Sequence, residues 1–268
     1  MISLDWKDRL VHDSVDFFER KLPNGDYDFD IIYNAYPERC ENKVPRDVIV
    51  LVANTLASKM LKKHKDYIAF CDYIWKYKGI NGKLAFACII SKFLRKDHLF
   101  YFDYAKKYLF AATDVAEINI LIDKIFFPLF KKLPQEHIET LISWLRDGNE
   151  RLNQQFLKIV FKIGKSDPEF LRKFSSKLEN RWLSANPEFV KICGVFLKGL
   201  SKVDYELYLS FYRSYKSTRE PIFVEILTDG LVKYEEFIYE TYESWGKSGN
   251  ARLKKAALTG LKFLKKRK

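Results

Sequence analysis

Residues 148–168 read GNERLNQQFLKIVFKIGKSDP, and this stretch decides the fold. Its apolar positions recur at intervals of three and four, which places them on one face of a helix. These positions are Leu152, Phe156, Ile159, Val160 and Ile163. Polar turns at residues 148–149 and 166–168 bound the apolar run. The stretch therefore predicts one amphipathic helix between two turns.

Turns of the same kind recur along most of the chain. One series opens helices at Pro134, Pro168 and Asp204, which are 34 and 36 residues apart. A second series interleaves with the first at intervals of 36, 37, 32 and 32 residues. Its members are Thr113, Asn149, Asn186, Thr218 and Asn250. Two interleaved series with a period near 35 residues are typical of antiparallel helix pairs stacked side by side.

We therefore predict an all-α fold, a right-handed α-solenoid of HEAT- or armadillo-like helix pairs. It forms a single domain over residues 1–268, with an irregular helical cap at 1–56 and repeats at 57–268. The second helix of each pair is expected to line the concave face. These second helices are predicted to begin near Asn81, Thr113, Asn149, Asn186, Thr218 and Asn250.

Composition excludes several other classes of protein. With 47% hydrophobic residues, 11 Gly and 8 Pro, the chain has the material for a folded core. No apolar run reaches the length of a membrane span, and charges in residues 1–9 occupy the place of a signal peptide's apolar stretch, so we expect a cytoplasmic protein. The four cysteines, Cys40, Cys71, Cys88 and Cys193, are scattered, which favours reduced, buried thiols over disulfides or zinc ligands. No motif for a cofactor or metal is found, and none is expected.

The chain is basic, with a net charge of +12, but the excess is unevenly spread. Residues 1–30 carry four basic and eight acidic residues, residues 31–134 carry eighteen and ten, and residues 135–251 carry seventeen of each. The last seventeen residues hold eight Lys or Arg and no acid. The last group includes Arg252, Lys254 and Lys255, which could bind phosphate or could simply form a solvated helix end.

Lysines in the neutral centre are spaced so that they share helix faces. The predicted second helices carry Lys158 and Lys162, then Lys191, Lys198 and Lys202, whereas the nearby acids fall mainly on the first helices. A segregated basic stripe is suited to the phosphate backbone of a duplex, since each neutralised phosphate releases counterions. We therefore predict double-stranded DNA as partner; an ordinary solvated face is the alternative.

Four stretches carry a resemblance to the DNA alkylation repair family, the AlkD-like HEAT-repeat glycosylases. They cover about half of the chain and are residues 74–87, 113–134, 144–152 and 189–194. The resemblance implies a HEAT-repeat fold and removal of alkylated purines from DNA. In this chemistry a carboxylate and aromatic rings stabilise positive charge on the departing base and sugar.

The resemblance implies a catalytic carboxylate in the stretch 113–134, for which Asp123 and Glu117 are the candidates. The family's aspartate aligns near Asn119, and Asp123 lies one helical turn later. The family's tryptophan four residues before the aspartate has no counterpart, since residues 114–123 contain no aromatic residue. Two further site residues are replaced, because Gln154 stands in place of an arginine and Val195 in place of a tryptophan. Ordinary surface carboxylates remain the alternative. The other function classes are a non-catalytic HEAT scaffold for a protein partner and an RNA binder that uses the terminal basic helix.

Overall fold

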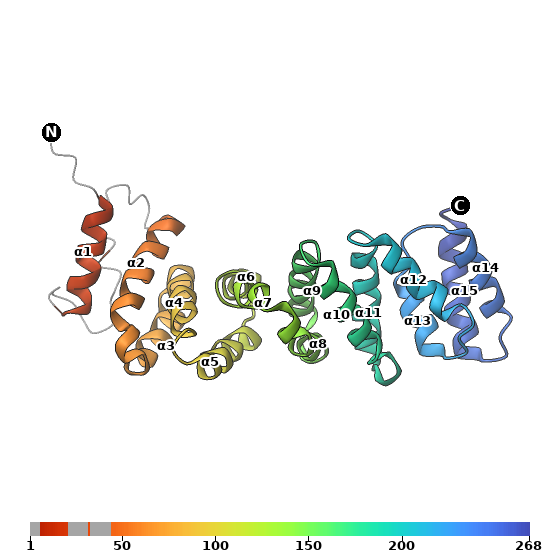
Figure 1. The fold of residues 1–268 in the computed structure, drawn as a ribbon, viewed down its shortest axis with the longest axis horizontal. Coiled ribbons are helices and arrows are strands. Elements are labelled where there is room, and N and C mark those ends of the chain that lie inside the picture. Colours follow the sequence, from red (N-terminus) through yellow and green to blue (C-terminus); the bar gives the residue numbers. More distant parts are fainter. Residues whose placement is uncertain (1–5, 21–31, 33–43) are drawn as a thin grey trace. The chain divides into compact units, whose positions relative to one another are not determined.

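The structure, a computed structural model, describes residues 6–20, 32 and 44–268. Every regular element within these ranges is helical and none of them is a strand, so the predicted all-α class is confirmed. The chain divides into two compact units, residues 1–129 and 130–268, and the boundary falls inside α7 (Phe127–Lys132) (Figure 1).

The first unit is built from helices of seven to fifteen residues. They are α1 (Trp6–Phe18), α2 (Arg46–Met60), α3 (Ile68–Tyr77), α4 (Gly79–Phe93), α5 (His98–Ala111) and α6 (Val115–Leu121), with a 3-10 segment at Leu61–Tyr67 and a π-helical segment at Ile122–Phe126. The helix α4 packs against α2, α3 and α6 and is buried along most of its length. Of the predicted cap, residues 1–5, 21–31 and 33–43 lie outside the described residues.

The second unit contains the helices that the turn series predicts. They are α8 (Ile138–Asp147), α9 (Glu150–Gly164), α10 (Pro168–Glu179), α11 (Pro187–Leu200), α12 (Tyr205–Tyr215), α13 (Pro221–Asp229), α14 (Glu236–Gly246) and α15 (Ala251–Lys265), with 3-10 segments at Pro134–His137 and Trp182–Ser184. The predicted apolar face of α9 is buried along its whole length. The second helices follow one another, since α9 packs on α11, α11 on α13 and α13 on α15 (Figure 1).

Side-chain caps place the helix starts where the sequence predicts them. Asn149, Asn186 and Asn250 each accept a backbone N–H from the first turn of α9, α11 and α15. The other starts differ slightly. Asp114 rather than Thr113 caps α6, and Asn81 lies inside α4, which begins at Gly79.

Aromatic residues fill the core of the second unit. The Phe161 and Phe196 rings stack with centroids 5.6 Å apart and join α9 to α11. Farther along, the buried Tyr212 hydroxyl donates to the Leu227 carbonyl at 2.8 Å, which satisfies a polar group inside the core. Aromatic residues therefore serve packing in this unit, and charged residues occupy the exposed faces of the second helices.

Candidate nucleic-acid interface

Five of the predicted lysines lie on or just after two adjacent helices. Lys158 and Lys162 belong to α9, Lys191 and Lys198 belong to α11, and Lys202 follows the end of α11. All five are exposed. Because α9 packs on α11, lysines from two successive helix pairs lie on neighbouring elements. We call these five residues the lysine face.

The predicted cations of the last helix lie in its first turn. Arg252, Lys254 and Lys255 are exposed on α15, which packs on α13. Lys191, Arg252 and Lys255 line one groove of about 420 Å³. The structure therefore brings a lysine of α11 to the same groove as two cations that lie about sixty residues later in the sequence.

The same groove also contains carboxylates, which the sequence analysis did not anticipate. Glu225 of α13 lines it, and its two oxygens accept hydrogen bonds from Arg252, from Nε at 2.7 Å and from Nη2 at 2.6 Å. A bidentate pair of this kind is a strong geometry for guanidinium and carboxylate. Arg252 is therefore already engaged by an acid, and a phosphate would have to compete for it.

Asp229 is the second carboxylate of this groove, at the end of α13. The helices α11 and α13 approach so closely that a Cβ on Gly194 would lie 2.4 Å from the Cβ of Asp229. Burial raises the pKa of Asp229, and the positive charges of Lys198 and Lys191 partly oppose that rise. Two acids of α13 therefore stand between the cations of α11 and those of α15.

The predicted catalytic residue Glu117 lies in the first unit, in the first turn of α6. Its side chain is only 16% exposed and forms an ion pair with Lys83 Nζ of α4. The same Lys83 ammonium lies over the Trp75 ring, 5.7 Å from its centroid. Glu117 is thus a paired carboxylate, and the positive charge of Lys83 already balances its negative charge.

Asp123, the other predicted catalytic residue, is exposed in the π-helical segment Ile122–Phe126. The Phe127 N–H donates to the Ile122 carbonyl, a bond that spans five residues instead of four. Pro128 accounts for this widening, because its ring lacks an N–H and would collide with the carbonyl four residues earlier. Such π-helical turns are frequent at functional sites, but this one has a local steric cause.

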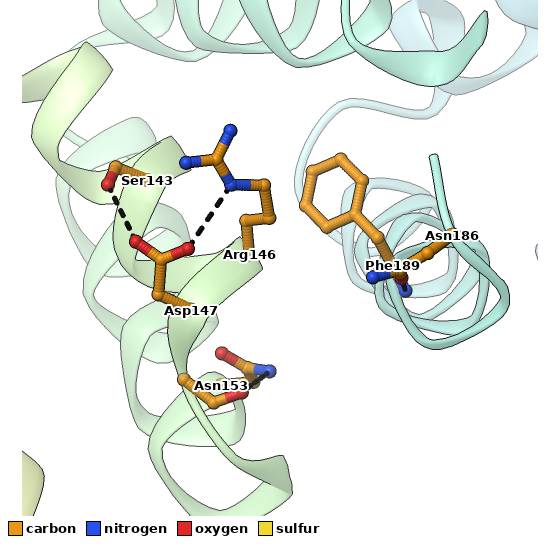
Figure 2. Close-up of polar contacts among 7 residues, drawn as sticks. Ser143, Arg146, Asp147, Asn153, Asn186 and Phe189 are labelled. Carbon is orange, nitrogen blue, oxygen red and sulfur yellow. Dashed lines mark hydrogen bonds and ion pairs between the residues drawn. The ribbon is translucent and has the colours of Figure 1, made fainter. Parts of the chain in front are cut away.

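Two of the three positions that differ from the pattern of the resembled family lie in one groove, whereas the third falls on α6 of the first unit. Gln154 of α9 and Val195 of α11 line a groove of about 640 Å³ together with Arg146 and Asn153. The Arg146 side chain rises from the end of α8 and turns back toward Asp147, to which its Nε donates at 3.2 Å (Figure 2). These two replaced positions therefore share a groove with a guanidinium.

Asn153 is a polar residue in the wall of this groove that the sequence did not single out. It is 5% exposed, and its Nδ2 donates to the Gly148 carbonyl at 3.1 Å (Figure 2). Its Oδ1 is buried and accepts no hydrogen bond from any described residue. Glycine is required at 148, since a Cβ there would lie 2.7 Å from this oxygen. The wall of the groove thus contains an unused acceptor.

A row of cations in the turns was missed by the sequence analysis. Each lies at or just after the end of a first helix, where a positive charge interacts favourably with the negative end of the helix dipole. They are Arg146, Arg181, Lys216 and Lys247, spaced 35, 35 and 31 residues apart. This spacing matches the turn period and could have revealed them. Arg146 and Arg181 form ion pairs with Asp147 and Glu139, both at 3.2 Å.

Other features of the described residues bear on chemistry and location. Within them, every helix is too short or too polar to cross a bilayer, and no group of three His, Cys, Asp or Glu side chains could hold a metal ion. Cys71, Cys88 and Cys193 are buried free thiols as predicted, and burial raises the pKa of each. Cys40 lies outside the described residues.

Comparison with known proteins adds no relative. No family model, no curated protein and no solved structure matches the chain.

Proposed function

We propose that this chain is a duplex-DNA-binding protein made of HEAT-like helix pairs, stacked as a right-handed α-solenoid. The packing of α9 on α11, α11 on α13 and α13 on α15 supports the stacked arrangement. The observation that carries the binding function is the lysine face. Its lysines are not balanced by acids of their own helices, because α9 and α11 have no acid beyond their first turns. A cytoplasmic location is part of the proposal.

A duplex would meet the lysine face through its phosphates. Exposed ammonium groups neutralise phosphates and release the counterions condensed on the DNA, which makes the affinity fall as salt rises. Interactions of this kind position a duplex without reading its sequence. We therefore expect binding to be insensitive to sequence and steeply dependent on salt.

Substitution of four of these lysines tests the proposal. In the variant K158Q/K162Q/K191Q/K198Q, duplex affinity falls, and the slope of log K against log salt becomes shallower by about 0.9 for each phosphate that is no longer neutralised. The measurement is fluorescence anisotropy of a labelled duplex between low and moderate salt. A variant of exposed cations on first helices, R172Q/K173Q/K177Q/R213Q, removes the same charge and is the matched control.

The two variants distinguish the lysine face from net charge. If both lose affinity equally, binding reflects overall charge and the lysine face is not the site. If the unaltered chain shows no salt-dependent duplex affinity, the proposal is wrong, and a scaffold for a protein partner and an RNA binder are the remaining interpretations.

Base release from alkylated DNA is a second candidate, supported by Lys83, which pairs with Glu117 and also lies over the Trp75 ring. The ion pair argues for binding without chemistry, because a neutralised carboxylate stabilises positive charge weakly. The assay is release of N3- or N7-methylpurine from alkylated duplex, with Asp123→Asn and Glu117→Gln beside the unaltered protein. We expect no release from any of the three. Release that either substitution abolishes would instead identify an enzyme.

A further inference from the structure

A groove of about 660 Å³ lies between two turns of the second unit, outside the lysine face. One turn joins α12 to α13 and the other joins α14 to α15. We call it the turn groove and define it by its charged residues and by the side chains that carry hydrogen-bond donors. They are Lys216, Thr218, Arg219, Trp245, Lys247 and Ser248.

Positive charge in the turn groove is unpaired. Lys216, Arg219 and Lys247 are exposed, and none forms an ion pair with another described residue. Among the described residues, no carboxylate lines the groove. Four further grooves of this unit each have at least one carboxylate in their walls, among them Glu139, Glu188 and Glu225. The turn groove is thus the one of these five that is suited to an anion.

Hydrogen-bond donors line the same groove. The Thr218 and Ser248 hydroxyl oxygens each accept a backbone N–H two residues later, both at 3.2 Å, so their O–H groups can still donate. Trp245 is 4% exposed, and its Nε1–H is buried without an acceptor among the described residues. Buried donors without a partner are rare in folded proteins. Trp245 is one of the residues that line the groove, so its indole N–H reports on a ligand bound there.

We propose that the turn groove binds a phosphate group. Three cations from two turns surround a space that lacks negative charge, which suits a tetrahedral anion that accepts hydrogen bonds from several directions. A ligand with a single carboxylate carries less charge and would be balanced by only one of these cations. The phosphate belongs either to a nucleic-acid backbone or to a free phosphate or monoester, and both present the same oxygens. The site does not depend on duplex binding by the lysine face.

The test is a titration of the full chain with inorganic phosphate. The chemical shift of the Trp245 indole N–H in NMR spectra is the readout. Comparison with Trp245→Phe assigns the signal among the five tryptophans. We expect a saturable shift that sodium chloride of equal ionic strength does not cause. In K216Q/R219Q/K247Q the affinity for phosphate falls at least about tenfold, because several charge-assisted hydrogen bonds are lost.

The matched control is K262Q/K265Q/K266Q, which removes three exposed lysines of the same unit at the far end of α15. It should bind phosphate as the unaltered chain does. Absence of a saturable shift, an equal shift with chloride, or equal affinity in both triple variants would each overturn the proposal.

A second titration identifies the source of the phosphate. If an unphosphorylated duplex saturates the same resonance, the groove takes a backbone phosphodiester; if only inorganic phosphate or a monoester does so, it takes a free phosphate group. Either result supports the site. The lysine-face variant K158Q/K162Q/K191Q/K198Q should keep its response to inorganic phosphate, so failure of the duplex proposal is separable from failure of this one.

Discussion

Asp229 lies at the crossing of α11 and α13, close to Lys198 and Lys191, and its burial raises its pKa. An acid whose folded pKa exceeds its unfolded pKa holds its proton more tightly in the folded state. Its contribution to stability is therefore full below the unfolded pKa and is lost as pH rises through the folded pKa. Near neutral pH the ionised Asp229 both reduces stability and offsets the charge of the adjacent lysines.

Asp229→Asn tests both effects. We expect the variant to be more stable than the unaltered chain at pH 7, by less than about 1 kcal/mol because Asp229 is exposed, with no such gain near pH 4. Urea denaturation at the two pH values measures this. Duplex affinity at pH 7 should rise, since a negative charge leaves the neighbourhood of Lys191 and Lys198. A variant that binds duplex more weakly would show that Asp229 does not oppose the lysines.

Single residues differ in how readily the sequence predicts them. The caps Asn149, Asn186 and Asn250 are recognisable because each acts on N–H groups two or three residues away. Asn153 follows the same turn as Asn149 in the sequence but is buried, with an unused acceptor. Its burial depends on how the end of α8 packs on α9, and no local pattern reveals that.

At the scale of elements, helix starts are predicted best where a proline and a capping side chain coincide. Asp167 and Asn186 precede Pro168 and Pro187, and both helices begin as expected. The turn at Thr218 leads into α13 with Pro221 as the first helical residue, although Glu220 at the capping position makes no capping hydrogen bond. The π-helical segment before Pro128 was not predicted, although the proline that accounts for it is visible in the sequence.

The close approach of α14 to α15 depends on Gly260. A Cβ at this position would lie 2.1 Å from the fully buried Tyr242 ring, whose hydroxyl accepts a hydrogen bond from Thr228 at 3.1 Å. The ring cannot move without breaking that hydrogen bond. Gly260→Ala should therefore destabilise the protein by about 1–3 kcal/mol despite the better helix propensity of alanine.

Chemical denaturation of Gly260→Ala measures the loss, and Ala256→Gly on the same helix gives an upper limit for the propensity effect, since it also removes a half-buried methyl group. If Gly260→Ala were as stable as the unaltered chain, the approach of α14 to α15 would be looser than the structure shows.

At the scale of the whole molecule, both units carry positive charge. Within the second unit, the cations of α9 and α11 are arranged differently from those of α15. Lysines of α9 and α11 are exposed on two helices that pack together, whereas α15 places Arg252 against an acid of α13. Deleting residues from Arg252 onward would not isolate the terminal charge, because Leu253 and Leu264 of α15 are buried in the second unit. Substitution of Lys262, Lys265 and Lys266 removes charge and leaves that core intact.

The sequence by itself determined the all-α class, the turn positions of the second unit and the buried face of α9, because capping and helical periodicity act over only a few residues. It did not reveal which charges meet. Only the tertiary structure decided that Arg252 pairs with Glu225 and Lys83 with Glu117, since the members of these pairs lie 27 and 34 residues apart on different helices. Helix packing brings them within reach, and an ion pair depends on distance in space.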